Sequence, residues 1–117
     1  MTLEIGNWGE ALAKTHLLEK GYEILETNYR FKKSEIDLIA KKENLIIAVE
    51  VKTRTGTKVG TPFLAITRAK QRNLLLGINH FVLNLNEPFE VRMDAISVTK
   101  HGEIIDIMHL EDAFPAF

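Results

Sequence analysis

The fold is decided by the stretch Ile47-Ala48-Val49-Glu50-Val51-Lys52-Thr53-Arg54. Apolar residues run from 45 to 49, and two charged side chains then follow two positions apart. A run so rich in β-branched residues predicts a strand buried on both faces, and strand alternation places Glu50 and Lys52 on one face. Buried charges must find partners or shift their pKa. Taken alone, the pair also fits a surface ion pair at a strand end, so its surroundings decide between the two interpretations.

An aspartate lies inside a second apolar run, with twelve residues between it and Glu50. The short charged segment 41–44 connects the two runs, which predicts a β-hairpin of 35–41 and 45–53. Asp37 and Glu50 then meet across neighbouring strands. Carboxylate oxygens suit Mg²⁺ or Mn²⁺, and Lys52 beside them can orient or deprotonate water.

The spacing Asp37-x₁₂-Glu50-x-Lys52 resembles the PD-(D/E)xK nuclease site, and further motifs extend the resemblance over nearly the whole chain. They are Gly6-Asn7-Trp8-Gly9-Glu10, Gly21-Tyr22, Asn28-Tyr29-Arg30, Glu35-Ile36-Asp37-Leu38-Ile39-Ala40, Val49-Glu50-Val51-Lys52-Thr53-Arg54, Lys70-Gln71 and Arg92-Met93-Asp94. Together they resemble the YraN (UPF0102) family. The resemblance implies a restriction-endonuclease-like core. The sequence departs from it at Ser34, where the family usually has glycine, which puts the turn before that residue in doubt.

Residues 2–20 predict a helix that ends at Gly21. Glu10 takes a half-buried position on it, from which a carboxylate could reach a metal. If the helix begins late, Asn7 is instead its N-cap and Glu10 the matching residue of a capping box. The residues alone leave both interpretations open. The family resemblance favours Glu10 as a third metal ligand beside Asp37 and Glu50.

Composition indicates one domain over residues 1–117, since 45% hydrophobic residues suffice for a single core. The chain has no cysteine, which excludes disulfides and thiolate zinc sites. Charged residues interrupt the N-terminal region where a signal peptide is apolar, and no apolar run is long enough to span a bilayer. We therefore expect a cytoplasmic protein without membrane contact.

The net charge of −1 hides an uneven distribution. Residues 30–72 hold eleven basic and four acidic side chains, whereas both flanking segments are acidic. Because a phosphate backbone meets the local field, this segment favours DNA or RNA as the partner. The alternative is that these lysines and arginines only keep turns and sheet edges soluble.

Candidate substrate contacts lie in and around this basic segment. Arg54 and Lys58 belong to a loop, 54–63, that is rich in threonine and glycine and suits phosphate binding without a P-loop pattern. Arg30, at the end of a strand predicted over 22–31, is a further candidate. A helix predicted from Thr67 to about residue 85 directs Lys70 towards a phosphate and Gln71 towards the attacking water.

The remaining elements complete an α/β fold in the order α-β-β-β-α-β-β. Strands are predicted over 90–99 and 103–110, and Arg92 and Asp94 fall on one face of the first and are expected to pair. A right-handed crossover makes the third and fourth strands parallel, giving a mixed sheet flanked by helices. The second helix carries a broad apolar face, 74–76 with 81–83, which is core or core plus a homodimer contact.

The leading functional hypothesis is a metal-dependent endonuclease that hydrolyses phosphodiester bonds in DNA or RNA. With no room for a recognition domain, structure-selective cutting is the better expectation. The first alternative is a non-catalytic nucleic-acid-binding or adaptor module that keeps the nuclease fold. The second is a carboxylate cluster that serves only as a structural ion-pair network.

Overall fold

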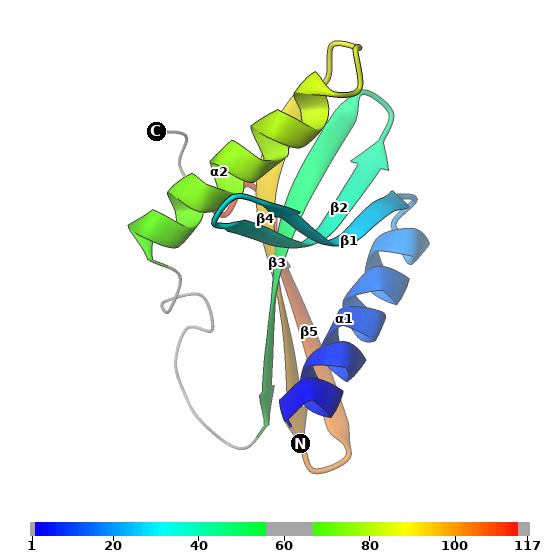
Figure 1. Ribbon diagram of the computed structural model, residues 1–117. Helices are drawn as coiled ribbons and strands as arrows, with labels where there is room; N and C mark the ends of the chain where they lie inside the picture. The colour runs from blue at the N-terminus through cyan, green and yellow to red at the C-terminus, as the bar shows by residue number, and fades with distance from the viewer. Residues whose placement is uncertain (1, 56–66, 115–117) are drawn as a thin grey trace.

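Five strands form one mixed sheet in the order β1-β2-β3-β4-β5, with one helix on each side of it (Figure 1). The computed structural model describes residues 2–55 and 67–114. The elements are α1 (Thr2–Glu19), β1 (Glu23–Phe31), β2 (Ser34–Lys42), β3 (Leu45–Thr55), α2 (Arg68–Leu83), β4 (Glu90–His101) and β5 (Ile104–Leu110). The predicted order and the predicted α/β class are confirmed.

Strand β3 is the centre of the sheet. It pairs antiparallel with β2 and parallel with β4, as the crossover through α2 requires. Its apolar run is buried on both faces: Ile47 and Val49 belong to the core under α1, and Ile46 and Ala48 to the core under α2. Strand alternation thus builds two hydrophobic layers from one segment. The prediction of a strand buried on both faces is confirmed.

Helix α1 ends in a Schellman motif at Gly21, whose φ is +91°. The amide of Gly21 donates to Leu18 O at 3.0 Å, and the amide of Tyr22 donates to Leu17 O at 3.0 Å. At its other end the helix begins at Thr2, so Asn7 lies inside it and cannot be the N-cap. The capping-box interpretation of Glu10 is therefore wrong.

The turn between β1 and β2 accommodates serine at position 34 without strain. The positive φ of this turn belongs to Lys32, at 55°, and Ser34 is already the first residue of β2. Ser34 is buried and its Oγ donates a hydrogen bond to Asn73 O at 2.5 Å, which fixes the hairpin to α2. Serine at this position therefore leaves the hairpin intact.

Helix α2 begins as predicted, with Thr67 as N-cap accepting from the amide of Lys70. Its apolar face is narrower than the sequence suggests, because Leu76 is 59% exposed and Leu83 is 77% exposed. Most exposed large hydrophobic side chains lie instead on the edge strand β5: Ile104, Ile105, Ile107, Met108 and Leu110. The homodimer stays a prediction.

Within the described residues, no helix is both long and apolar enough to cross a membrane.

Candidate metal and phosphodiester site

The candidate site lies where β2 separates from β3. Their ladder ends at the pair Leu38 and Val49, and the next residue of each strand carries a carboxylate, Asp37 and Glu50. Asp37 Oδ2 accepts a hydrogen bond from the amide of Val51 at 2.8 Å. The side chain thus satisfies a β3 amide beyond the last ladder pair. The predicted hairpin and the meeting of the two carboxylates are confirmed.

Glu50 is buried, and its two carboxylate oxygens have different surroundings within the described residues. Its side chain is 3% exposed, and Oε1 lies 2.9 Å from Lys70 Nζ and 3.7 Å from Lys52 Nζ. Among the described residues, no group gives a hydrogen bond to the buried Oε2. Such an atom is destabilising, because burial removes its water without replacing it.

Asp37 carries the electrostatic consequence of this arrangement. Burial raises the pKa of Asp37 to about 7, and the negative charge of Glu50 adds to the rise, while the hydrogen bond from Val51 opposes it. Glu10 on α1 raises the pKa further, so its carboxylate lies within electrostatic range. The neighbouring carboxylates thus disfavour the ionised form of Asp37 until a cation compensates their charge.

Two lysines approach Glu50 from different elements. Lys70 reaches it from the first turn of α2, which confirms that this side chain points to the sheet. Burial would lower the pKa of Lys70, but its hydrogen bond with Glu50 and the nearby carboxylate charges raise it overall. Lys70 is therefore a cation at neutral pH. Lys52, beside Glu50 on β3, is 28% exposed and lies at the rim of the site.

The other predicted site residues are placed less closely. Glu10 and Gln71 are both half-buried, Glu10 on α1 and Gln71 next to Lys70 on α2. In the part of the chain that the structure describes, no three acidic or histidine side chains are grouped for a metal ion. Asp37 and Glu50 lie opposite each other just beyond the end of the β2–β3 ladder. The roles of Glu10 and Gln71 stay predictions.

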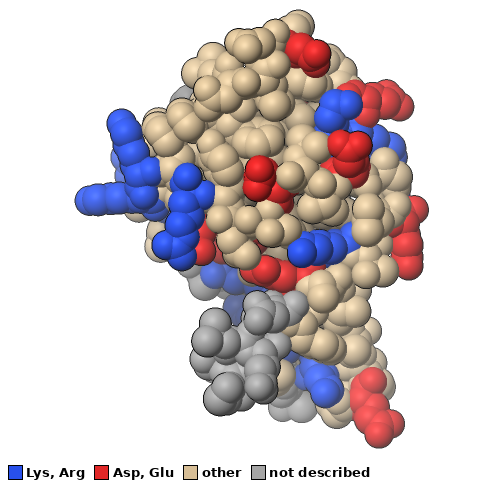
Figure 2. Space-filling model, turned by 45° about the vertical axis from the view of Figure 1, so that its right-hand side comes forward, with Lys and Arg blue, Asp and Glu red and all other residues tan. Residues whose placement is uncertain are grey.

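Two of the predicted substrate contacts, Arg30 and Arg54, lie on the sheet, on β1 and β3. Arg30 is 75% exposed and pairs with Glu35, with 3.5 Å between Nη2 and Oε1. Arg54 is half-buried near the end of β3, and Lys58 lies outside the described residues. Figure 2 shows Lys and Arg side chains projecting together from one edge of the molecule. Their contact with substrate stays a prediction.

Comparison with known proteins places the chain in a family. The model of the uncharacterised protein family UPF0102 matches residues 9–98. The chain belongs to the UPF0102 family. It is 43% identical over 114 residues to a UPF0102 protein of Flavobacterium psychrophilum, covering 97% of this chain and 96% of that one. A UPF0102 protein of Caldicellulosiruptor saccharolyticus is 42% identical over 114 residues, covering 95% and 97% of the two chains.

The residues of this UPF0102 chain fit a hard divalent cation. Both carboxylates offer oxygen ligands, and the buried Oε2 of Glu50 lacks a hydrogen-bond partner among the described residues. Mg²⁺ commonly binds through one or two carboxylates and keeps several waters, so a third protein ligand is not required. Burial and repulsion by Glu50 raise the pKa of Asp37, and positive charge at this point would relieve the repulsion.

Strand β4 of the UPF0102 chain carries a second buried carboxylate. Asp94 accepts from Arg92 Nε at 2.8 Å and from Arg92 Nη2 at 2.9 Å, so the predicted pair is confirmed. His109 Nε2 also lies 2.8 Å from Asp94 Oδ2, a contact that sequence reasoning missed. The register of β4 and β5, which the turn at Gly102 determines, is the signal that could have found it.

Proposed function

We propose that this UPF0102 protein is a metal-dependent endonuclease, which hydrolyses phosphodiester bonds in DNA or RNA. One observation carries the proposal: Glu50 is buried beside a second carboxylate and two lysines, and one of its oxygens has no hydrogen-bond partner among the described residues. A buried carboxylate beside a half-buried one contributes poorly to stability, because both lose hydration and repel each other. A ligand that uses the free oxygen explains the arrangement better.

In this proposal Asp37 and Glu50 hold Mg²⁺ or Mn²⁺, and Glu10 is an additional ligand. The bound cation would supply positive charge at the scissile phosphate and activate water. Lys52, at the rim beside Glu50, orients the attacking water or takes its proton. Gln71 orients the same water from α2.

The basic side chains hold the substrate backbone. Lys70 is cationic and neutralises charge that develops on the phosphate. Arg30, Arg54 and Lys58 contact neighbouring phosphates. Because phosphate contacts carry no base information, we propose selection by substrate structure rather than by base sequence. The substrate class and the absence of cysteine are consistent with a cytoplasmic protein.

The test is cleavage of a labelled panel of DNA and RNA containing single strands, duplexes, flaps and four-way junctions. Wild type is expected to cut with Mg²⁺ or Mn²⁺ and not with EDTA. Lys52→Ala should lower the rate by roughly 10²–10⁴-fold while binding stays within a few-fold. Lys41→Ala is the control, since this lysine lies at the opposite end of β2.

A second readout follows the cation without cleavage. Mn²⁺ is expected to raise the melting temperature of wild type, because it binds only the folded chain, and not that of Glu50→Gln. If wild type binds nucleic acid in a salt-sensitive way but does not cleave it, the adaptor hypothesis is favoured over the nuclease. If Glu50→Gln still cleaves, the active site does not depend on Glu50 and lies elsewhere.

A further inference from the structure

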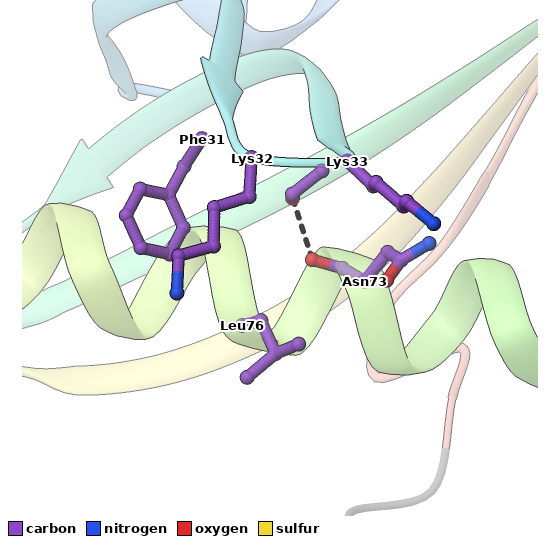
Figure 3. A pocket seen from close by; sticks show the side chains of 6 residues that line it. Phe31, Lys32, Lys33, Asn73 and Leu76 are labelled. Carbon is purple, nitrogen blue, oxygen red and sulfur yellow. Dashed lines mark hydrogen bonds between the residues drawn. The ribbon is translucent and has the colours of Figure 1, made fainter.

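A cavity of about 260 Å³ lies where the β1–β2 turn meets α2 (Figure 3). Its lining combines apolar side chains, two lysines and short polar groups: Phe31, Lys32, Lys33, Ser34, Asn73 and Leu76. Figure 3 shows the Phe31 ring and the Leu76 side chain bordering it, with Lys32 extending between them. None of these residues has a part in the cleavage chemistry proposed above.

One wall of the cavity is an ordered aromatic platform. The Phe31 ring stacks on the imidazole of His80, with 3.7 Å between centroids and 12° between planes. His80 Nδ1 is itself 2.7 Å from Tyr29 Oη, which holds the imidazole in place. Lys32 Nζ lies 5.3 Å from the centroid of Phe31. Lys32 is exposed, so this weak cation–π contact can give way to a flat ligand.

Size and charge narrow the class of ligand. Sites for drug-sized molecules usually enclose ~300–1,000 Å³, so this cavity suits one aromatic ring system rather than a larger ligand. Two exposed lysines at its border favour an anionic group attached to that ring system. A nucleobase with its phosphates has both properties, because every base offers a π-face for stacking.

The cavity is joined to the carboxylate site through two elements. Ser34 lines it and begins β2, and Asp37 follows three residues later, about 10 Å along the strand. Asn73 lines it from α2, one turn after Lys70, whose ammonium contacts Glu50. The Ser34–Asn73 hydrogen bond ties the two elements together. A short stretch of single-stranded nucleic acid can therefore reach the cavity and the carboxylate site at the same time.

We propose that this cavity receives the base of one unpaired nucleotide of the substrate strand, with the flanking phosphates on Lys32 and Lys33. The inference rests on the proposed nuclease function and makes it more specific. A base inside a duplex cannot enter such a cavity unless it leaves the stack. The feature recognised near the cleaved bond is thus a single-stranded or flipped-out nucleotide, in DNA or RNA alike.

The test compares Leu76→Glu with Leu83→Glu, measuring anisotropy of fluorescein-labelled 12-nucleotide strands and of a blunt duplex in EDTA. Both leucines are exposed and lie on α2, so both variants should fold, but only Leu76 lines the cavity. Leu76→Glu is expected to weaken single-strand binding roughly tenfold, the size of one lost stacking contact. Duplex binding should change less than twofold, and Leu83→Glu should resemble wild type.

A strand containing 2-aminopurine reports stacking directly, because its emission falls when it stacks. Wild type is expected to quench it and Leu76→Glu to quench it less. If adenosine monophosphate competes for the cavity as effectively as an unlabelled single strand does, the cavity binds a free nucleotide and the proposal is overturned. Equal single-strand affinity of Leu76→Glu and wild type would also overturn it.

The two proposals fail separately. If Leu76→Glu selectively loses single-strand binding but wild type does not cleave, the base cavity is supported and the nuclease is refuted. If wild type shows metal-dependent cleavage but Leu76→Glu binds single strands as wild type does, the nuclease is supported and the base cavity is refuted.

Discussion

Two aspartates of the same sheet, the half-buried Asp37 and the buried Asp94, have pKa values shifted in opposite directions. Burial would raise the pKa of Asp94, but hydrogen bonds from His109, Arg92 and the amide of Asp112 outweigh it and lower that pKa. Burial and the charge of Glu50 raise the pKa of Asp37 to about 7, because its one backbone hydrogen bond opposes them only in part. The negative charge of Asp94 is thus balanced by protein groups, as in a structural ion pair. The charge of Asp37 is balanced only in part, as in a ligand-binding site.

Asp94→Asn is expected to destabilise the fold by about 3 kcal/mol at pH 7, because it breaks a buried ion pair. The lowered pKa means that the carboxylate contributes stability above its ordinary pKa, and that this contribution is lost as pH falls through the folded value. Urea unfolding at pH 7, 5 and 3 should show the gap from wild type narrowing at acid pH. Asp106→Asn is the control, since Asp106 is 70% exposed. A gap that does not vary with pH would refute this account.

Sequence reasoning succeeded at residues whose position follows from strand alternation. Asp37, Glu50 and Lys52 follow from a hairpin with a short connection, and Arg92 with Asp94 from a two-residue spacing. It could not foresee that the Lys70 ammonium contacts Glu50. That contact depends on the docking of α2 against the sheet, which no local pattern determines.

Helix α2 approaches the β1–β2 hairpin closely at Gly77. A Cβ at this position would overlap Ser34 Oγ and lie 3.1 Å from Ile36 Cδ1. The element boundaries were predictable because Thr67 and Gly21 are strong local signals. The close approach of Gly77 to Ser34 was not predictable, since the two residues are 43 positions apart in the sequence. This contact positions the β1–β2 turn, which borders the cavity.

Gly77→Ala is expected to lower the free energy of unfolding by roughly 1–3 kcal/mol, although alanine is the better helix former, because the added methyl overpacks the contact. Combining it with Ser34→Gly should cost at least about 1 kcal/mol less than the two single changes together. Urea denaturation of the four proteins measures this coupling. Asn79→Ala, at an exposed position of the same helix, should change stability little. Additive effects would mean that the two residues do not meet.

At the scale of the whole molecule, the distribution of charge is more informative than the net charge. The net charge is −1, yet residues 30–72 hold eleven of the fifteen basic side chains. Several of these occupy the surroundings of the fork between β2 and β3 and of the adjacent cavity. A substrate would thus meet a positive surface locally, while the acidic flanks reduce attachment of nucleic acid elsewhere.

Salt dependence distinguishes phosphate binding from a general solubilising role. Lys33→Ala is expected to reduce the slope of log affinity against log salt by about 0.7 for a single strand, the loss of one phosphate contact. Lys41→Ala removes the same charge from the other end of β2, next to Phe89, and should leave the slope unchanged. Anisotropy titrations between 50 and 200 mM salt, roughly the range over which such slopes are resolved, measure both. Equal slopes for the two variants would show that these lysines act through overall charge, because only a located contact can make one position matter more than the other.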